Sequence, residues 1–158
     1  MLFSQPTTYA IMALCLMNRE YHGAIVKSRE LAVTLGIHEA YLSKVLSRLA
    51  QKGLVQSHRG PSGGFQLTAD PTTISLGDIL AACDDLESLT TGCVMGMTEC
   101  NESALCSWHD IWKQFREDAS DIIRRVTLNE LGELMERRFP GAIVGRQYTA
   151  QIFTPFRR

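Results

Sequence analysis

Apolar positions recur every three or four residues in six stretches of the chain, which is the spacing of one face of an α-helix. In the third stretch Leu42, Val45, Leu46 and Leu49 follow an i, i+3, i+4, i+7 pattern. Pro6 can open the first helix, because its missing N–H falls where a helix has no internal partner. The predicted helices cover residues 6 to about 17, 29–35, 39–51, 76–82, 108 to about 125, and 128 to the Pro140-Gly141 stop.

The second and third predicted helices are separated only by Gly36-Ile37-His38, and Ser28 is the expected N-cap of the second. Two short helices joined by a glycine-containing turn are typical of a helix-turn-helix. Residues 54–58 and 65–67 then predict two strands around the turn from Arg59 to Gly64. A glycine-rich hairpin directly after a helix-turn-helix indicates a wing. We therefore expect a mainly α fold with a small β-hairpin wing.

The order of helix, turn, helix and wing favours DNA binding. The outward face of the third helix carries hydrogen-bond donors, opposed by one acid, Glu39. That face alone could equally be a solvated surface, but the wing that follows it favours the DNA interpretation. Residues 1–70 also carry seven Lys and Arg against four Asp and Glu, a small excess that suits a polyanion. The predicted DNA contacts are Ser28, Tyr41, Ser43, Lys44, Ser47, Arg48, Arg59, Gly60, Gly63 and Gly64, with Arg59 suited to a minor groove.

The helix predicted from Trp108 carries the most regular apolar pattern, with alternating steps of four and three residues. Such a stripe needs a partner, and the simplest partner is its copy in a second subunit. Packing against the chain's own domain is the alternative. A homodimer also suits the two half-sites of a palindromic operator on double-stranded DNA. The predicted dimer-interface residues are Trp108, Trp112, Phe115, Ala119, Ile122 and Val126.

Between these two regions, Cys93, Cys100, Cys106 and His109 follow the spacing C-x6-C-x5-C-x2-H. The intervening residues have no helical or strand period, so packing does not explain three thiols. No signal peptide or membrane span is expected, and this predicts a cytoplasmic protein, in which structural disulfides are rare. Soft thiolates suit zinc or an iron–sulfur cluster, so we expect a metal or cluster site here.

The chain resembles the IscR/NsrR-type family of winged-helix iron–sulfur regulators over roughly residues 1–135. The matching residues are Tyr9-Ala10, Tyr41-Leu42, Gly53-Leu54-Val55, the Arg59-Gly60-x-x-Gly63-Gly64 wing, the three cysteines and Thr127-Leu128. The resemblance implies a homodimeric transcription factor whose DNA affinity responds to a cluster held by Cys93, Cys100 and Cys106. It also implies that His109 completes a [2Fe–2S] site. Thr8 stands where NsrR-like members place an aspartate that ligates a [4Fe–4S] cluster, so [2Fe–2S] is expected in preference to [4Fe–4S].

The resulting hypothesis is a transcriptional repressor, not an enzyme, that senses iron–sulfur status, redox stress or nitric oxide. Two alternatives stay open: a zinc or cluster-free thiol sensor loop on the same DNA-binding module, and a small iron–sulfur redox carrier. Cys15 and Cys83 lie in predicted helices and are expected to be structural. The expected organisation is a DNA-binding domain (1–83), a cysteine-rich cluster-binding loop (84–107), a dimerisation helix with a short following helix (108–138) and a tail (139–158) without an assigned role.

Overall fold

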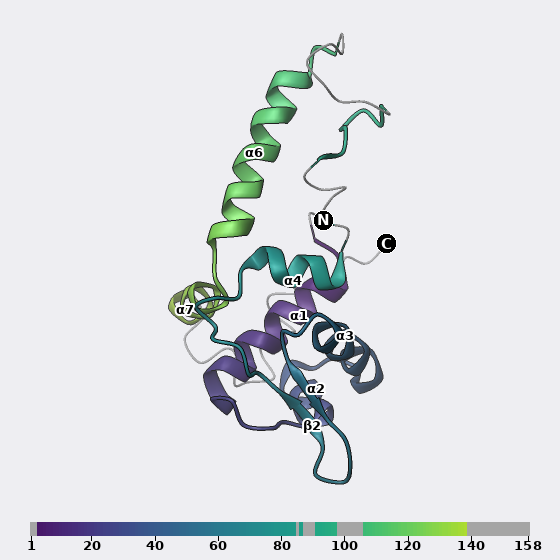
Figure 1. Ribbon diagram of the computed structural model, residues 1–158, viewed down its shortest axis with the longest axis vertical. Coiled ribbons are helices and arrows are strands. Elements are labelled where there is room, and N and C mark those ends of the chain that lie inside the picture. The colour runs from purple at the N-terminus through teal and green to yellow at the C-terminus, as the bar shows by residue number, and fades with distance from the viewer. Residues whose placement is uncertain (1–2, 85, 87–90, 98–105, 139–158) are drawn as a thin grey trace.

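The computed structural model describes residues 3–84, 86, 91–97 and 106–138, so Cys100 and the C-terminal tail lie outside the described residues. Figure 1 shows helices gathered around α1, a two-stranded hairpin at one end, and helix α6 extending from the other end. The elements in chain order are α1 (Gln5–Leu16), a π-helical turn η1 (Met17–Tyr21), α2 (Ser28–Leu35), α3 (Glu39–Gln51), β1 (Gln56–His58), β2 (Gly64–Gln66), α4 (Leu76–Cys83), α6 (His109–Arg125) and α7 (Leu128–Arg138).

These elements confirm the expected fold class, mainly α with one antiparallel hairpin. Helix α3 begins and ends at the predicted residues, because four buried Leu and Val side chains define its inner face. Several bounds differ from the prediction. Strand β1 covers Gln56–His58 rather than residues 54–58, and β2 ends at Gln66 rather than at residue 67, because the pairing begins at Gln56 and Gln66. Lys27 is the N-cap of α2, and Ser28 is the first helical residue rather than the cap. Strand β2 begins at Gly64, one residue earlier than predicted, because the register pairs His58 with Gly64.

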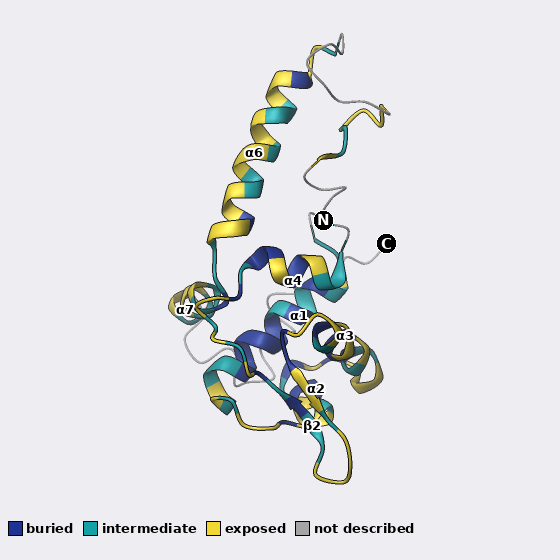
Figure 2. Ribbon diagram, in the orientation of Figure 1, coloured by how far each residue is buried: buried dark blue, intermediate teal, exposed yellow. Residues whose placement is uncertain are grey.

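Helix α1 runs through the middle of the body and packs against α3, α4 and α7. Every residue from Met12 to Met17 is buried, because a helix that is surrounded on several sides needs apolar side chains all round. Figure 2 shows this helix as the most continuously buried segment of the body. The most deeply buried large side chains are Leu14, Leu16, Met17, Leu31, Leu35, Leu42, Leu46, Leu49, Ile79, Leu80 and Leu128.

The starts of α4 and α7 lie together, although more than fifty residues separate them in the sequence. Ser75 and Thr127 form an isolated antiparallel bridge, and the amide of Leu128 donates to the carbonyl of Ile74 at 2.8 Å. Leu128 itself is completely buried in the core. After α6, the chain therefore packs again against the helices around α1, beginning at Thr127 and Leu128.

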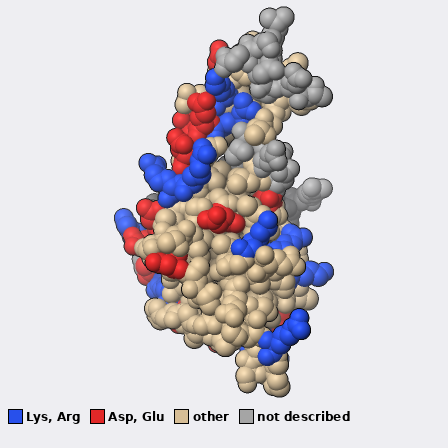
Figure 3. Space-filling view, viewed as in Figure 1, with Lys and Arg blue, Asp and Glu red and all other residues tan. Residues whose placement is uncertain are grey.

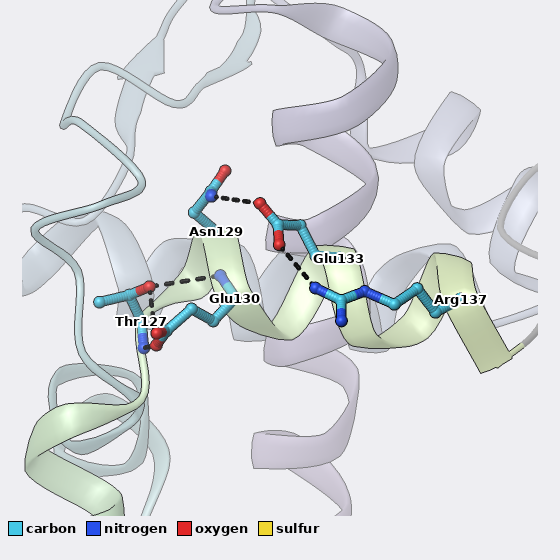
Figure 4. Close-up of polar contacts among 5 residues, drawn as sticks. All are labelled: Thr127, Asn129, Glu130, Glu133 and Arg137. Carbon is cyan, nitrogen blue, oxygen red and sulfur yellow. Dashed lines mark hydrogen bonds and ion pairs between the residues drawn. The ribbon is translucent and has the colours of Figure 1, made fainter.

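Each of these two helices begins with a capping box, in which two orphan N–H groups are satisfied by side chains. At the start of α7 the amide of Thr127 donates to the Glu130 carboxylate at 2.8 Å, and the amide of Glu130 donates to the Thr127 hydroxyl at 3.2 Å (Figure 4). The sequence predicts this capping box, because Thr127 and Glu130 have its Thr-x-x-Glu spacing, and the structure confirms it. Ser75 and Asp78 make the equivalent pair of bonds at the start of α4.

Helix α6 extends away from the body, and Figure 2 shows its surface as largely exposed. Its C-terminal turn meets the body, where Ile123 packs against Leu76 and Leu80 of α4. Among the described helices, none is long and apolar enough to cross a membrane.

Candidate DNA interface and metal centre

The outward face of α3 presents Lys44 and Ser47, which are both exposed. The Ser47 hydroxyl donates to the carbonyl of Ser43 at 2.8 Å within the helix, and Lys44 is an exposed cation on the same face. Tyr41 lies at the flank, where its ring meets Tyr9 edge-on with centroids 5.6 Å apart. Burial and, next, the neighbouring Tyr9 raise the pKa of Tyr41, so its hydroxyl stays protonated and can donate a hydrogen bond.

Arg48 is exposed on α3 and lies near enough to Cys83 and Asp84, at the end of α4, for its charge to act on both. Burial raises the pKa of Cys83, and the charge of Arg48 opposes this effect. The same guanidinium helps the hydrogen bonds from Ser4 and Thr7 to lower the pKa of Asp84, although burial, the largest single cause, acts the other way. Arg48 therefore lies between the predicted DNA face and the first residue after α4.

An open hollow separates the start of α2 from the wing. The hydroxyl of Ser28 donates to the Glu39 carboxylate at 3.4 Å within it. The N-cap of α2 makes no side-chain hydrogen bond, so the positive end of this helix dipole faces the hollow uncapped. Sequence reasoning missed Lys27 and Arg29 as candidate phosphate contacts; the signal was this pair of basic residues on either side of Ser28. The residues that line the hollow include Lys27, Ser28, Arg29, His58, Gly60 and Gly63.

The side chain of Gln66 in the wing is hydrogen-bonded to the turn that follows η1, and His58 in turn is bonded to Gln66. The amide nitrogen of Gln66 donates to the carbonyl of Gly23 at 2.7 Å, which leaves its amide oxygen as an acceptor. Nε2 of His58 lies 2.8 Å from that oxygen, so the ring carries its hydrogen on Nε2. The base of the wing is therefore held in one orientation relative to the helices.

Two of the wing glycines are required by close contacts inside the protein. A Cβ on Gly63 would lie 2.2 Å from the carbonyl oxygen of His58, and a Cβ on Gly64 would lie 2.4 Å from that of Val26. Gly60 has a φ of 103° with open space around it. Arg59, beside it, is exposed at the wing. The predicted approach of these glycines to DNA stays a prediction, and their packing explains two of them without a ligand.

The cysteine segment, defined as residues 93–109, is described at its two ends. Cys93 is half-buried, and its carbonyl accepts from the amide of Gly96 at 3.0 Å in a turn where Gly96 has a φ of 71°. Cys106 is also half-buried, and its carbonyl accepts from the amide of His109 at 3.0 Å, which places these two residues within one turn. His109 is 7% exposed at the start of α6.

Within the described residues, which do not include Cys100, no three Cys, His, Asp or Glu side chains are assembled as a metal site. The proposed ligands Cys93, Cys106 and His109 are therefore not brought together as a three-donor group. Their chemistry nevertheless fits a cluster or zinc, since two half-buried thiols and a buried imidazole are soft or borderline donors. The ligand assignment, with Cys100, stays a prediction.

The predicted dimer stripe on α6 divides into two faces. Trp108, Phe115 and Ile122 are exposed by 57, 45 and 49%, and Ile111 beside them by 66%. Trp112 is half-buried on the side of α6 that meets the residues before Cys93. The exposed face is apolar and has no partner within the described part of this chain. Ala119 is half-buried, and Val126 is half-buried against the small cluster of Leu76, Leu80 and Ile123.

Acidic and basic side chains lie close together along the projecting part of the molecule, whereas most of the body shown in Figure 3 is uncharged on this face. On α6 the Arg124 guanidinium lies 3.7 Å from the Asp121 carboxylate, and both side chains are largely exposed. Mixed charge beside an apolar stripe keeps such a helix soluble while leaving the stripe available for association.

Comparison with known proteins assigns the class. Residues 3–133 match the family model Rrf2, described as an iron-dependent transcriptional regulator. The chain is 33% identical over 123 residues to the HTH-type transcriptional regulator IscR of Vibrio vulnificus (strain YJ016), covering 78% of this chain and 72% of that protein. It is 30% identical over 141 residues to IscR of Escherichia coli O1:K1, covering 89% and 84%.

Solved structures agree with the fold. The structure of CymR, the global cysteine regulator of B. subtilis, has a TM-score of 0.65 at 25% identity, over 84% of this chain and 96% of that one. An oxidized form of Staphylococcus aureus CymR has a TM-score of 0.62 at 25% identity, over 84% and 97%.

A helix-turn-helix and wing on one core, followed by a projecting helix, define a winged-helix transcriptional regulator that binds DNA. This chain belongs to the Rrf2 family of transcriptional regulators and is similar to IscR.

Proposed function

We propose that the protein is a homodimeric repressor whose affinity for double-stranded DNA is set by an iron–sulfur cluster. Cys93, Cys100 and Cys106 would hold the cluster, with His109 as the fourth ligand and [2Fe–2S] preferred over [4Fe–4S]. One observation carries the proposal: the residue before Cys93 is hydrogen-bonded to α6, and the other end of the cysteine segment, at Cys106 and His109, leads directly into that helix, which exposes the predicted dimer face. A change in the segment would therefore act on the helix that sets subunit spacing.

The cluster would supply a centre that reacts with oxidants or nitric oxide and that holds distant parts of the segment together when bound. The protein's own contribution is placement. His109 lies at the first residue of α6, and its amide bond to Cys106 keeps the last thiol within a turn of the imidazole. A buried imidazole beside a thiol needs little reorganisation to ligate, because its side chain is already ordered by packing.

The DNA contacts of the proposed regulator come from three places. Lys44 and Tyr41 on α3 would enter the major groove with Ser43, Ser47 and Arg48 beside them. The uncapped start of α2, at Ser28, would meet a phosphate. The wing residues Arg59, Gly60, Gly63 and Gly64 would meet the adjacent minor groove.

The dimer would form through the exposed stripe of α6, with Trp108, Phe115 and Ile122 at its centre and Trp112, Ala119 and Val126 at its edges. Two copies would cover central side chains that are 45 to 57% exposed in one chain, and they would present two α3 helices to a palindromic operator. We also propose the division into residues 1–83, 84–107, 108–138 and 139–158, and a cytoplasmic location for the regulator.

The cluster is tested on protein isolated anaerobically. Wild type is expected to show a visible chromophore with matching iron and sulfide, whereas Cys93→Ala, Cys100→Ala and Cys106→Ala are expected to lose it and remain folded dimers. Cys83→Ala is the matched control, because this thiol lies in α4 outside the cysteine segment. Full iron and sulfide content in all three segment variants would refute the ligand assignment. His109→Ala should shift or weaken the spectrum if the imidazole ligates.

DNA binding is tested with Lys44→Ala in a mobility-shift or anisotropy titration at several salt concentrations. Loss of one phosphate or base contact should weaken binding, and loss of a phosphate contact should lower the slope of log K against log salt by about 1. Arg124→Ala removes an equally exposed cation from α6, away from α3, and should change neither value. Equal effects of the two variants would refute α3 as the reading surface.

A second candidate function is a cluster-free thiol or zinc sensor on the same DNA-binding module. This candidate is supported by the similarity to CymR, for which one solved structure is an oxidized form. A colourless protein that contains stoichiometric zinc, or whose DNA affinity changes on thiol oxidation without iron, would select this candidate. Loss of the response in Cys93→Ala would still locate the sensor in the cysteine segment.

A further inference from the structure

Two side chains of α6 grip the backbone immediately before Cys93. The indole N–H of Trp112 donates to the carbonyl of Gly92 at 2.7 Å. One guanidinium nitrogen of Arg116 donates to the carbonyl of Thr91 at 2.5 Å and reaches that of Gly92 at 3.3 Å. Two consecutive carbonyls of the chain that leads into the cysteine segment are therefore fixed to the helix.

The two donors belong together because residues four apart share one face of a helix. Trp112 is further held by its neighbour, since its ring stacks on Phe115 with centroids 5.1 Å apart and planes 19° from parallel. Trp108 offers the contrast: it is 57% exposed and lies one turn earlier on the same helix. Of the two tryptophans in the chain, the structure uses Trp112 to hold the backbone beside the first cysteine.

The hydrogen bonds from Trp112 and Arg116 restrict the backbone at Cys93. The carbonyl of Gly92 and the amide of Cys93 lie in one rigid peptide plane, so fixing the first orients the second. On its other side, the carbonyl of Cys93 is fixed by the amide of Gly96 at 3.0 Å. Both peptide groups that flank this thiol are thus restrained, one of them by α6.

We propose that Trp112 and Arg116 are positioning residues that tether Cys93 to α6, the helix on which Cys106 and His109 are also anchored. This inference rests on the proposed function, because it assigns regulation of the same segment. The tether keeps the first thiol close to the helix before any cluster binds, and it limits the backbone rearrangement that ligation requires. The stack on Phe115, which is 45% exposed on the predicted dimer face, connects the tether to that face.

The test uses the metal-free full-length protein and measures the alkylation rate of each cysteine by iodoacetamide and mass spectrometry. Trp112→Phe keeps an aromatic ring and removes the N–H donor. Loss of one net hydrogen bond should raise the alkylation rate of Cys93 about 2- to 10-fold, and leave that of Cys106 unchanged. Arg124→Gln, near the other end of α6 and outside the predicted dimer stripe, is the control and should leave both rates at the wild-type values.

Arg116→Gln, with Arg124→Gln as its control, repeats the test if Trp112→Phe fails to fold. A second readout is the rate at which the reconstituted chromophore is lost, which should rise by the same factor in both tether variants. Equal alkylation of Cys93 in wild type and in both tether variants would overturn the tether. Failure of wild type to take up iron and sulfide would instead overturn the proposed function, and the alkylation rates would still decide the tether.

Discussion

The reading head, defined as residues 3–83, and helix α6 are built from the same kind of amphipathic helix but differ in what covers the apolar side. In the reading head Leu46 and Ile79 are completely buried. On α6 Ile111 is 66% exposed and Trp108 57%. Equivalent patterns of sequence therefore end in opposite environments within one chain.

This difference in burial means that the apolar faces of the reading head stabilise its fold, whereas the apolar face of α6 does not. Apolar faces of α1, α3 and α4 meet one another, so the reading head can reach its structure by burying its own surface. The exposed face of α6 is not matched inside the described part of the chain, and one of its sides grips the start of the cysteine segment. Within the described residues, α6 is held mainly at its C-terminal turn and by the backbone that precedes Cys93.

The largest expected contrast between the two regions is in thiol reactivity. Burial raises the pKa of Cys15, in the reading head, to about 12 from an ordinary value of 9.0. Because only the thiolate is nucleophilic, Cys15 should be alkylated about 1,000-fold more slowly than an ordinary cysteine at pH 8. Mass spectrometry of the metal-free protein after timed iodoacetamide treatment measures this. Labelling of Cys15 as fast as Cys106 in native protein would show that the head opens readily; labelling in urea is the positive control.

Truncation of core side chains should separate the two regions in free energy of unfolding. Leu46→Ala removes a fully buried side chain and should cost about 2–5 kcal/mol in a urea titration. Ile111→Ala, on the exposed stripe, should change the unfolding free energy of the monomer by less than about 0.5 kcal/mol. It should instead weaken dimerisation about tenfold or more, measured by sedimentation of the protein over a series of dilutions. A large loss of monomer stability in Ile111→Ala would place this side chain in an intramolecular core.

The reading head was largely predictable because its periodicity reflects contacts inside the chain. Helix α3 begins and ends where its pattern predicts. Outside the reading head, the capping box at Thr127 is also present as its sequence spacing predicts. However, the apolar stripe of an amphipathic helix shows only that one face is covered, and it does not show which partner covers that face. It therefore could not say that Trp112 faces the backbone of Gly92 while Phe115 faces solvent.

Other features depend on close contacts that no spacing records. The hairpin glycines suggested an approach to DNA, whereas Gly64 lies against the carbonyl of Val26 too closely for any Cβ. Ser28 has the chemistry of an N-cap, but the chain turns into the helix one residue earlier, at Lys27. The three thiol ligands were predicted from thiolate chemistry and His109 from the family resemblance, and Cys100 lies outside the described residues.

A smaller effect is expected at Asp84, the first residue after the reading head. The hydroxyl of Thr7, which is completely buried, donates to the Asp84 carboxylate at 2.7 Å. Thr7→Val keeps the shape and removes the donor, and should cost about 1–2 kcal/mol at neutral pH. The pKa of Asp84 is lowered on folding: burial raises it, but the bonds from Ser4 and Thr7 outweigh burial.

The sign of the pH dependence follows from that direction. A lowered folded pKa contributes stability that is complete above about pH 4, the ordinary carboxyl range, and is lost as the pH falls through the folded pKa. The difference between wild type and Thr7→Val should therefore narrow below about pH 4 in thermal unfolding curves. A constant difference down to pH 2 would mean that the threonine acts by packing alone. Thr8→Val, one residue along, is the control without a bond to Asp84.

The smallest expected effect concerns the base of α6. Thr127→Ala removes one half of the α7 capping box, and Ser75→Ala does the same for α4; each should cost about 1 kcal/mol. Because Ser75 and Thr127 are bridge partners, the double variant should depart from additivity by about 0.5 kcal/mol or more. Additive costs in urea titrations would show that the two caps act separately. The junction would then be a pair of independent helix starts, and α6 would be anchored to the reading head mainly by Ile123.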